Sequence, residues 1–465
     1  MNNIRVISAV VAGLSVLLPR DGRALTRSVP AEYSNIQSAI AASATGDSVL
    51  VAPGTYSGPG NRDLDLRGKD VVLIGLGGPS VTTLDAGGSE IEPHRAILAL
   101  GLTTATIVEG LTLTGGYAGG GGAVQALGQG TIRSCVVSGN HASDGGGILL
   151  PLTTSTLIVE DTTIESNQAH RGGGVALDLG ILVMRRSVIR GNVCTGDNSP
   201  WVQGGGISLS RGSGAPAPQA LLEDTQITGN TADYGGGIGA RMSTLDLLRC
   251  TVAGNFARVR GGGFYQISGW VHVYDSVVWD NGAPDGPFFY NVYTDAGGDS
   301  NFYCSIVDPD GASGGIPVGL FPGTFAATPL FCEPLFWTEA PTVAGDFHLA
   351  ANSPALAENN DCGRQLGAFG QGCAAVSVPS EEPSASGELI EVRSNPALGG
   401  RLSVVLRPPT GQTAEIGVFT ADGRRVASWR SDRKLERELR LDPGVYLLRA
   451  NCASSREWRK VVVLP

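Results

Sequence analysis

The sequence predicts an all-β protein, in which a right-handed single-stranded parallel β-helix is followed by a small C-terminal β-sandwich. Three observations predict this class. Glycine occurs 68 times among 465 residues, often in GGG triplets, while aromatic residues make up 6%. An asparagine recurs between Asn140 and Asn281 with aliphatic residues at fixed offsets, and short turn-bounded strands follow near the C-terminus. A repeat of roughly 25 residues in a chain of this length indicates a solenoid with a second folding unit.

The first 24 residues have the features of a signal peptide. Arg5 provides a charged start, an uncharged apolar stretch runs from Val6 to Leu18, and small residues at Gly22 and Ala24 suit a cleavage site. The apolar stretch is too short to span a bilayer. We therefore predict a signal peptide at 1–24, no transmembrane helix, and a secreted, extracellular or outer-surface location in a bacterium.

Export permits disulfide bonds among the eight cysteines. Cys304, Cys332, Cys362 and Cys373 crowd into one region, and we predict that Cys362 pairs with Cys373. The cysteines form no CxxC motif, and the five histidines, which we expect at the surface or in caps, show no metal-ligand spacing. We therefore expect neither a metal nor a cofactor.

The repeat is clearest when the chain is aligned on its asparagines, which are separated by 27, 25, 38, 25 and 26 residues. Aliphatic residues stand three and eight positions before each, a Cys, Thr or Ser stands five before, and a GGG triplet follows the first five. Equivalent residues of successive coils stack about 4.8 Å apart, so these columns face one interior. We expect Cys135 and Cys250 to be unbridged packing thiols. We also expect the asparagines to take left-handed backbone and to bond neighbouring coils.

Two irregular coils fit the same alignment. Residues 106–124 predict an earlier coil with Gly116 in the asparagine position. The interval of 38 predicts one coil with an insertion from Val193 to Gln203, which contains Trp201. Leucine-rich and helical repeats fit poorly, because GGG and clustered β-branched residues break helices and no LxxLxL frame recurs.

The motif SGN-x-A-x-x-GGG-I, as in Ser138 to Ile148, resembles the repeats of polymorphic outer-membrane proteins and other pectin-lyase-like β-helix proteins. Residues 36–56 are similar to the N-terminal cap of such solenoids, and Thr328 to Gly370 resembles their closing segment. The resemblance implies a β-helix over residues 25–373, in which a short helix covers one end of the apolar tube.

A small, Pro/Ser/Glu-rich linker is predicted at 374–388, followed by short strands over 389–465. This last part resembles the C-terminal sorting domain of type IX secretion cargo, and equally the immunoglobulin-like domain of flagellar hook-capping proteins. The resemblance implies contact with secretion machinery or surface attachment. Residues 389–465 carry a net charge of +6 and the remainder −16, and an acidic main body argues against nucleic acid as a partner.

Solenoids of this group include polysaccharide lyases and glycoside hydrolases, but the coils lack the paired-acid motifs of the galacturonan hydrolases. The turns after the asparagines and the strands after GGG nevertheless predict a polar stripe along the outer face, which an elongated sugar chain could follow. Trp201 would stack on the sugar while Arg171 and Arg241 held its carboxylates. The competing interpretation is that turns are polar because they are solvated. The stripe consists of Asp144, His170, Arg171, Asp178, Trp201, Asp233 and Arg241.

Two functions remain open from the sequence. The first is a non-catalytic secreted or cell-surface scaffold, adhesin-like or carbohydrate-binding, whose partner is an extracellular polysaccharide or a cell-surface glycan. The alternative is a polysaccharide lyase or glycoside hydrolase that uses the outer-face stripe.

Overall fold

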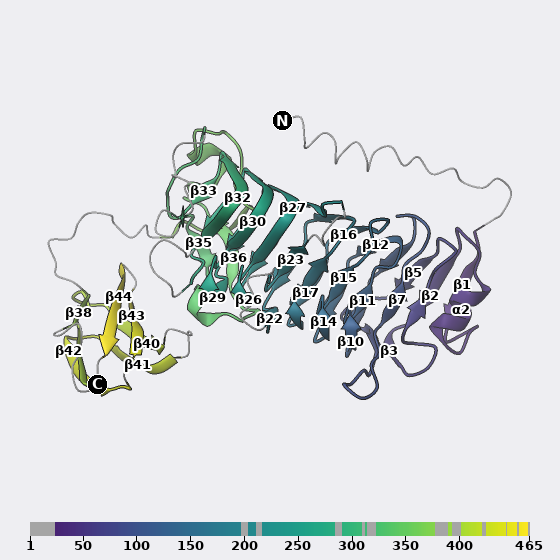
Figure 1. The fold of residues 1–465 in the computed structure, drawn as a ribbon, viewed down its shortest axis with the longest axis horizontal. Helices are drawn as coiled ribbons and strands as arrows, with labels where there is room; N and C mark the ends of the chain where they lie inside the picture. Colours follow the sequence, from purple (N-terminus) through teal and green to yellow (C-terminus); the bar gives the residue numbers. More distant parts are fainter. Residues whose placement is uncertain are drawn as a thin grey trace. The chain divides into compact units, whose positions relative to one another are not determined.

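The computed structural model describes residues 24–196, 203–210, 216–283, 291–308, 312–313, 322–376, 389–392, 401–420, 425–442, 444–452 and 455–463. Its contacts divide the chain into two compact units, residues 1–374 and 375–465. The first unit is a stack of parallel β-coils (Figure 1). The second contains antiparallel sheets. The predicted fold class is confirmed, while residues 1–23 of the predicted signal peptide lie outside the described part.

A regular coil contains four short strands. One coil runs through β13 (Val136–Ser138), β14 (His141–Asp144), β15 (Ile148–Leu150) and β16 (Thr156–Glu160). The next runs through β17 (Thr163–Glu165), β18 (Gln168–Arg171), β19 (Val175–Leu177) and β20 (Ile181–Arg185). Each strand pairs in parallel with its counterpart one coil on. Equivalent residues therefore stack in columns along the unit.

The aliphatic columns form the core, as predicted. Their side chains have no exposed surface in a single continuous cluster. The small-residue column lies in the same wall, and burial raises the pKa of the Cys135 and Cys250 thiols to about 12. Both cysteines are unbridged, which confirms their role as packing residues. The buried aliphatic residues include Val137, Ile164, Ile189, Ile227, Val252, Val278, Ile132, Val159, Met184, Leu222, Leu247 and Val273.

The asparagines form a hydrogen-bonded ladder inside the corner of the coils. Oδ1 of Asn167 accepts from the backbone N–H and from Nδ2 of Asn140, at 3.1 and 2.9 Å. The same pair of bonds repeats from coil to coil as far as Asn291. At the other end, the N–H of Gly116 donates to Oδ1 of Asn140, so this glycine occupies the asparagine position as expected.

The expectation that the asparagines themselves are left-handed is wrong. The residue before each one has positive φ instead: Gly139 at 66°, Ser166 at 55° and Asp280 at 50° are examples. This left-handed residue turns the chain, and the asparagine that follows points its amide inward, where its buried groups are satisfied by the next coil.

The coils change shape towards the C-terminal end of the solenoid. β23 (Ile207–Ser210) and β24 (Gln219–Glu223) are separate strands, but both pair with the single strand β27 (Ile238–Leu248). β30 (Phe264–Tyr274) and β32 (Val292–Tyr303) continue this long wall (Figure 1). The connection between the two strands is reduced to a bend with positive φ at Met242 and Ser268, so the strands join and the wall becomes broad.

The long interval between Asn192 and Asn230 contains extra residues in two places. The step from Asn192 to Ile207 covers 15 positions, whereas the paired step from Asn167 to Val175 covers eight. More residues enter between β23 and β24. The predicted insertion at Val193 to Gln203 therefore accounts for only part of the difference. Trp201 lies outside the described residues.

The N-terminal end of the core is covered by α2 (Ile36–Ala42), a short helix beside β1 (Thr26–Val29). Oδ1 of Asn35 accepts from the N–H of Ser38 at 2.9 Å and caps the helix. Ile36 and Ile40 are buried in the same cluster as the coil columns. The helix therefore places apolar side chains where the first coil has no preceding neighbour.

The closing segment packs on the flank of the solenoid. β35 (Phe331–Glu333), β36 (Asp346–Ala350) and β37 (Gln371–Cys373) form a small sheet. This segment shares a core with Ala253 and Val277, which face outward from the coils. The N–H of Thr342 also donates to the carbonyl of Gly229, several coils before the end. The segment thus covers a side wall, because that wall carries apolar residues on its outer face.

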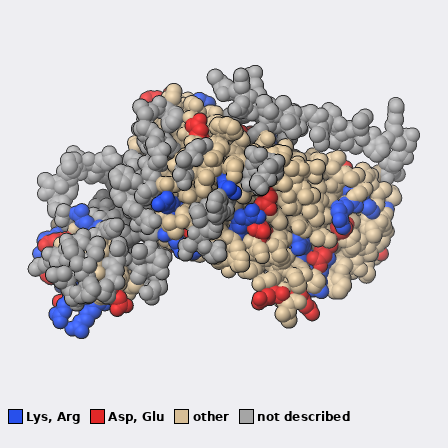
Figure 2. All heavy atoms as spheres, in the orientation of Figure 1, with Lys and Arg blue, Asp and Glu red and all other residues tan. Residues whose placement is uncertain are grey.

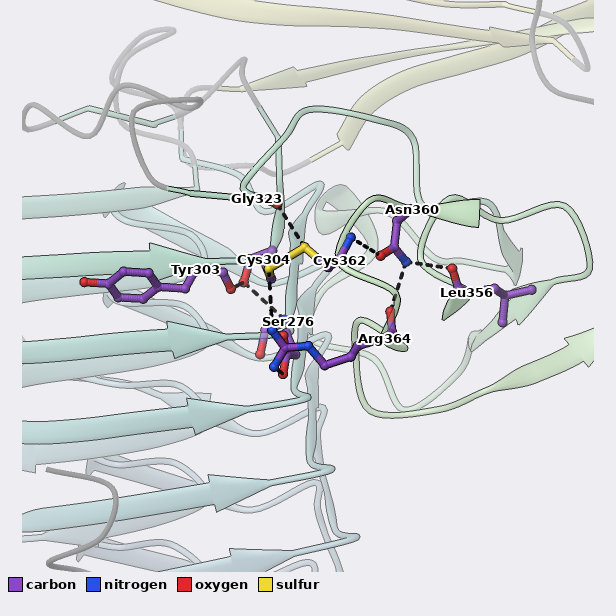
Figure 3. Close-up of a disulfide and its surroundings, with 10 residues drawn as sticks. Ser276, Tyr303, Cys304, Gly323, Leu356, Asn360, Cys362 and Arg364 are labelled. Atoms are coloured by element: carbon purple, nitrogen blue, oxygen red, sulfur yellow. Dashed lines mark hydrogen bonds and ion pairs between the residues drawn. A yellow bond between two sulfur atoms is a disulfide. The ribbon is translucent and has the colours of Figure 1, made fainter. Parts of the chain in front are cut away.

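The predicted disulfide Cys362–Cys373 is wrong. Cys362 pairs with Cys304, which belongs to the last coils (Figure 3). Cys373 pairs with Cys332. β35 and β37 both pair with β36, and the Cα atoms of Cys332 and Cys373 lie 5.9 Å apart. Nearness in sequence was a poor guide, because the partners are separated by 58 and 41 residues.

The second unit consists of two antiparallel sheets around one core. One sheet holds β38 (Ile390–Val392), β39 (Arg401–Leu406) and β42 (Leu435–Arg440). The other holds β41 (Arg425–Ser431), β40 (Ala414–Thr420), β43 (Gly444–Cys452) and β44 (Ser455–Val463). Side chains from both sheets belong to a single buried cluster, which is the predicted β-sandwich. Across the described ranges, none of the helices is long and apolar enough to cross a membrane.

We expect Val252→Asp to lower the free energy of unfolding of the solenoid. Val252 has no exposed surface and stacks between Ile227 and Val278, so the substitution buries an unpaired charge and costs at least ~3 kcal/mol. Leu102→Asp is the matched control, because Leu102 is 54% exposed. Thermal unfolding of both variants tests the register, which is wrong if Val252→Asp melts like the parent.

We expect a chain that ends at Gly387 to keep a folded solenoid. The two units have separate buried clusters with no shared member among the described residues. Circular dichroism and calorimetry of the truncated chain should show the cooperative β-transition of the parent solenoid. Loss of that transition would contradict the independence of the two cores.

Candidate ligand-binding surface

Three residues of the predicted stripe meet at the corner after β18. Asp144 and Arg171 are paired one above the other on β14 and β18, and Asp178 follows β19. Nε of Arg171 lies 2.8 Å from Oδ1 of Asp144, and a terminal nitrogen lies 2.7 Å from Oδ1 of Asp178. One guanidinium therefore joins two carboxylates, one from its own coil and one from the preceding coil.

Burial dominates the electrostatics of this group. It raises the pKa of Asp178, and the attraction of Arg171 offsets only part of the effect. Burial lowers the pKa of Arg171, but the two carboxylates outweigh it and the net shift is upward. The positive charge of Arg171 is thus balanced by Asp144 and Asp178. Arg171 can bind the carboxylate of a sugar only in competition with these two residues.

Asp233 was predicted to present its carboxylate to a ligand, but the structure buries this side chain. The residue is only 4% exposed, and its carboxylate bonds the guanidinium of Arg258 from the next coil. Its backbone N–H donates to Oε1 of Gln203 at 3.1 Å. Asp233 therefore serves to hold adjacent coils together.

The remaining stripe residues are spread along the coils. His170 is exposed one position before Arg171. Arg241 lies on β27 in register with Ser210, further along the column that begins near Asp178. Trp201 cannot be placed, because it lies outside the described residues. The structure thus brings Asp144, Arg171 and Asp178 together, while His170 lies one position before Arg171 and Arg241 lies two coils beyond Asp178.

Two alternating columns of charge were missed in the sequence. They stand six and seven positions before the asparagines, and their ion pairs run from coil to coil. On the face drawn in Figure 2, acidic and basic side chains of the coils lie next to one another. The alternation of sign would have been visible once the coils were aligned. The columns are Glu109, Arg133, Glu160, Arg185, Glu223 and Asp161, Arg186, Asp224, Arg249, Asp275.

The closing segment continues one of these columns. Arg364 lies 3.1 Å from Asp275, the last acidic member, and the next position of that column is Cys304. Cys304 is bonded to Cys362, two residues before Arg364 (Figure 3). An ion pair and a disulfide therefore attach the segment at adjacent positions.

An aromatic face on the broad wall was also missed. Trp270, His272 and Tyr274 occupy alternate positions of β30, and Trp270 is 55% exposed. Nδ1 of His272 lies 2.8 Å from Oδ1 of Asp246 on β27. The alternation Trp-Val-His-Val-Tyr is the sequence signal that would have indicated this face, since it places Val273 in the core and the aromatic residues outside. His272 lies on the outward face of the wall, in agreement with the surface position expected of the histidines, and it is paired with Asp246.

Within the described ranges, no group of three or more His, Cys, Asp or Glu side chains could hold a metal ion. The candidate surfaces therefore consist of ion pairs, hydrogen-bonding groups and aromatic rings.

Comparison with known proteins gives only structural likenesses. No protein-family model matches the chain, and no curated protein matches it in sequence. A crystal structure of the pectate lyase Pel9A is 14% identical, with a TM-score of 0.49, and the match covers 76% of this chain and 97% of that one. Full-length tailspike protein 2 from Escherichia coli O157:H7 bacteriophage CAB120 is 11% identical, with a TM-score of 0.27, and covers 95% and 68%. The assignment as a parallel β-helix protein rests on the strand ladders themselves.

We expect Arg171→Gln to destabilise the solenoid by about 1–3 kcal/mol at neutral pH, because it leaves two part-buried carboxylates without their shared cation. The pKa of Asp178 is already raised, and it should rise further in the variant. The deficit should therefore shrink as pH falls through that raised pKa, once the carboxylate is protonated.

Arg67→Gln is the control, because the Arg67 side chain in its pair with Asp65 is 59% exposed. Melting temperatures between pH 4 and 8 make the comparison. An Arg171→Gln deficit that is constant over this range would contradict the electrostatic explanation.

Proposed function

We propose that this protein is a secreted or cell-surface β-helix scaffold that binds carbohydrate without cleaving it. The observation that carries the proposal is the double ion pair of Arg171 with Asp144 and Asp178. Glycoside hydrolysis requires two carboxyl groups that act separately on either side of the bond. Here both carboxylates bind one guanidinium, which makes them part of the scaffold.

A scaffold of stacked coils suits an elongated ligand. Its outer side chains repeat at the spacing of β-strands and are fixed by bonds between coils, so the surface is ordered before a ligand arrives. Sugar chains are long and rich in hydroxyl groups, which such rows of polar groups can bind. A non-catalytic, adhesin-like role requires only this recognition.

Export is supported by the disulfide pairs Cys304–Cys362 and Cys332–Cys373, because such bonds persist in oxidising compartments. The signal-peptide features of residues 1–24 agree with this location. The C-terminal β-sandwich would then contact secretion machinery or attach the protein to the outer surface of a bacterium.

The alternative function is a polysaccharide lyase or glycoside hydrolase, and one observation favours it. Asp246 orients the imidazole of His272 on the outer face of β30. An imidazole that a carboxylate orients is suited to act as a general base. His272 is therefore the residue to test for catalysis.

Binding and turnover on a panel of acidic and neutral polysaccharides, with and without calcium, distinguish the two functions. We expect the full chain to retain at least one soluble polysaccharide in affinity electrophoresis and to release no reducing ends or unsaturated products. Turnover by the parent that is abolished in His272→Ala would establish the enzyme instead. Absence of binding to every polysaccharide of the panel would contradict the scaffold proposal.

A further inference from the structure

The outer side of the broad wall carries a compact group of side chains that we call the aromatic face. Its centre is Trp270, His272 and Tyr274 on β30. Val271 and Val273, which alternate with them, are buried in the core of the solenoid. This anchoring fixes the outward direction of the three side chains.

Neighbouring strands complete the face in register. β27 places Thr244, Asp246 and Leu248 beside the three central residues, in that order. β32 places Asp299, Asn301 and Tyr303 on the other side. The face thus extends over three consecutive coils, in the columns that β24 occupies in the coil before them.

We propose that the aromatic face is a binding subsite for the neutral sugar rings of a polysaccharide, with Trp270 as the stacking platform and His272 as a hydrogen-bonding group. This inference rests on the proposed carbohydrate-binding function and names its location and ligand class.

Trp270 supplies the stacking surface. Its exposed fraction of 55% contrasts with 8% for Trp337, and the other exposed large hydrophobic side chains of the described residues are aliphatic. An exposed indole on a rigid strand is unfavourable in water and offers a flat apolar surface to the faces of sugar rings. Tyr274 and Tyr303 stack on each other at 5.1 Å and 10°, which gives the face a second aromatic edge.

Asp246 prepares His272 for hydrogen bonding. Its carboxylate is 1% exposed and lies 2.8 Å from Nδ1, so a neutral imidazole keeps its proton there and leaves Nε2 to accept from a sugar hydroxyl. Oδ2 of the same carboxylate is buried and has no hydrogen-bond partner among the described residues. A buried carboxylate oxygen without a hydrogen-bond partner is uncommon, and this one lies beside His272 on the adjacent strand.

The charge of the face selects the ligand class. The exposed Asp299 lies beside Trp270 on β32, so a uronic acid would be repelled and a neutral sugar would not. Trp270 and Tyr274 are four residues apart on one strand, which is about 13 Å. That distance suits a short stretch of a sugar chain better than a single ring.

The test is affinity electrophoresis and calorimetry of the full chain with laminarin, xylan and galactomannan as neutral probes and polygalacturonate as the acidic probe. We expect the parent to bind a neutral probe, Trp270→Ala to bind it about tenfold more weakly, and Trp270→Phe to retain most of the affinity. His272→Ala should also weaken binding. Leu152→Ala is the control for loss of an exposed apolar side chain, because Leu152 is 43% exposed. The Trp270 and Leu152 variants should melt like the parent, whereas His272→Ala should melt at a lower temperature, because it leaves the buried Asp246 carboxylate without its partner.

The outcomes separate this proposal from the general function. Neutral-probe binding that survives in Trp270→Ala, or binding of polygalacturonate alone, overturns the aromatic face as the subsite. If the combined replacement of Trp201, Arg171 and Arg241 by alanine abolishes that binding instead, the carbohydrate-binding function stands with a different location. If the parent binds none of the four probes, both proposals fail.

Discussion

The parallel register between coils is the constraint on which the rest of this structure depends. Each residue lies directly above and below the equivalent residues of the neighbouring coils. A side chain must therefore be able to pack against two side chains of a similar type. The asparagine column shows how a polar group meets this condition. An asparagine amide both donates and accepts, and each one donates to the next while accepting from the one before. A buried carboxylate or ammonium in the same column would face only like charges.

The outer surface is subject to the same stacking constraint, and it meets this constraint by alternating the sign of its charges. Like charges stacked at strand spacing repel, so the columns beside the corner alternate between Glu or Asp and Arg from coil to coil. Each exposed pair adds little stability by itself. Together they exclude a shift of register by one coil, because such a shift would place acids against acids. The closing segment uses this arrangement when Arg364 pairs with the unmatched Asp275.

Alignment of the coils predicted the buried repeating columns, whereas the alternating charge columns and the non-repeating contacts were missed. The aliphatic columns, the unbridged Cys135 and Cys250, and the glycine that stands in for asparagine at 116 all followed from alignment of the coils. The disulfide partners did not, because they depend on where a non-repeating segment packs. The partners of Arg171 and Asp233 also could not be predicted, since a turn residue can face solvent, its own coil or the next coil without any change in its spacing.

The same distinction locates function in the molecule. In regular coils, the turn after the asparagine is short and its charged side chains bond each other, as in the group around Arg171 and the pair of Asp233 with Arg258. Such residues have little freedom to exchange their partners for a ligand without a loss of stability. The aromatic face of β30 lies in columns that the earlier coils also have, but there the alternating charges end at Glu223. Leu248, Tyr274 and Tyr303 follow in that column, so its side chains no longer bond the next coil through ion pairs of opposite charge. Trp270 stands in the same coils and is 55% exposed, so this solenoid offers an aromatic side chain to a ligand where its alternation of charge ends.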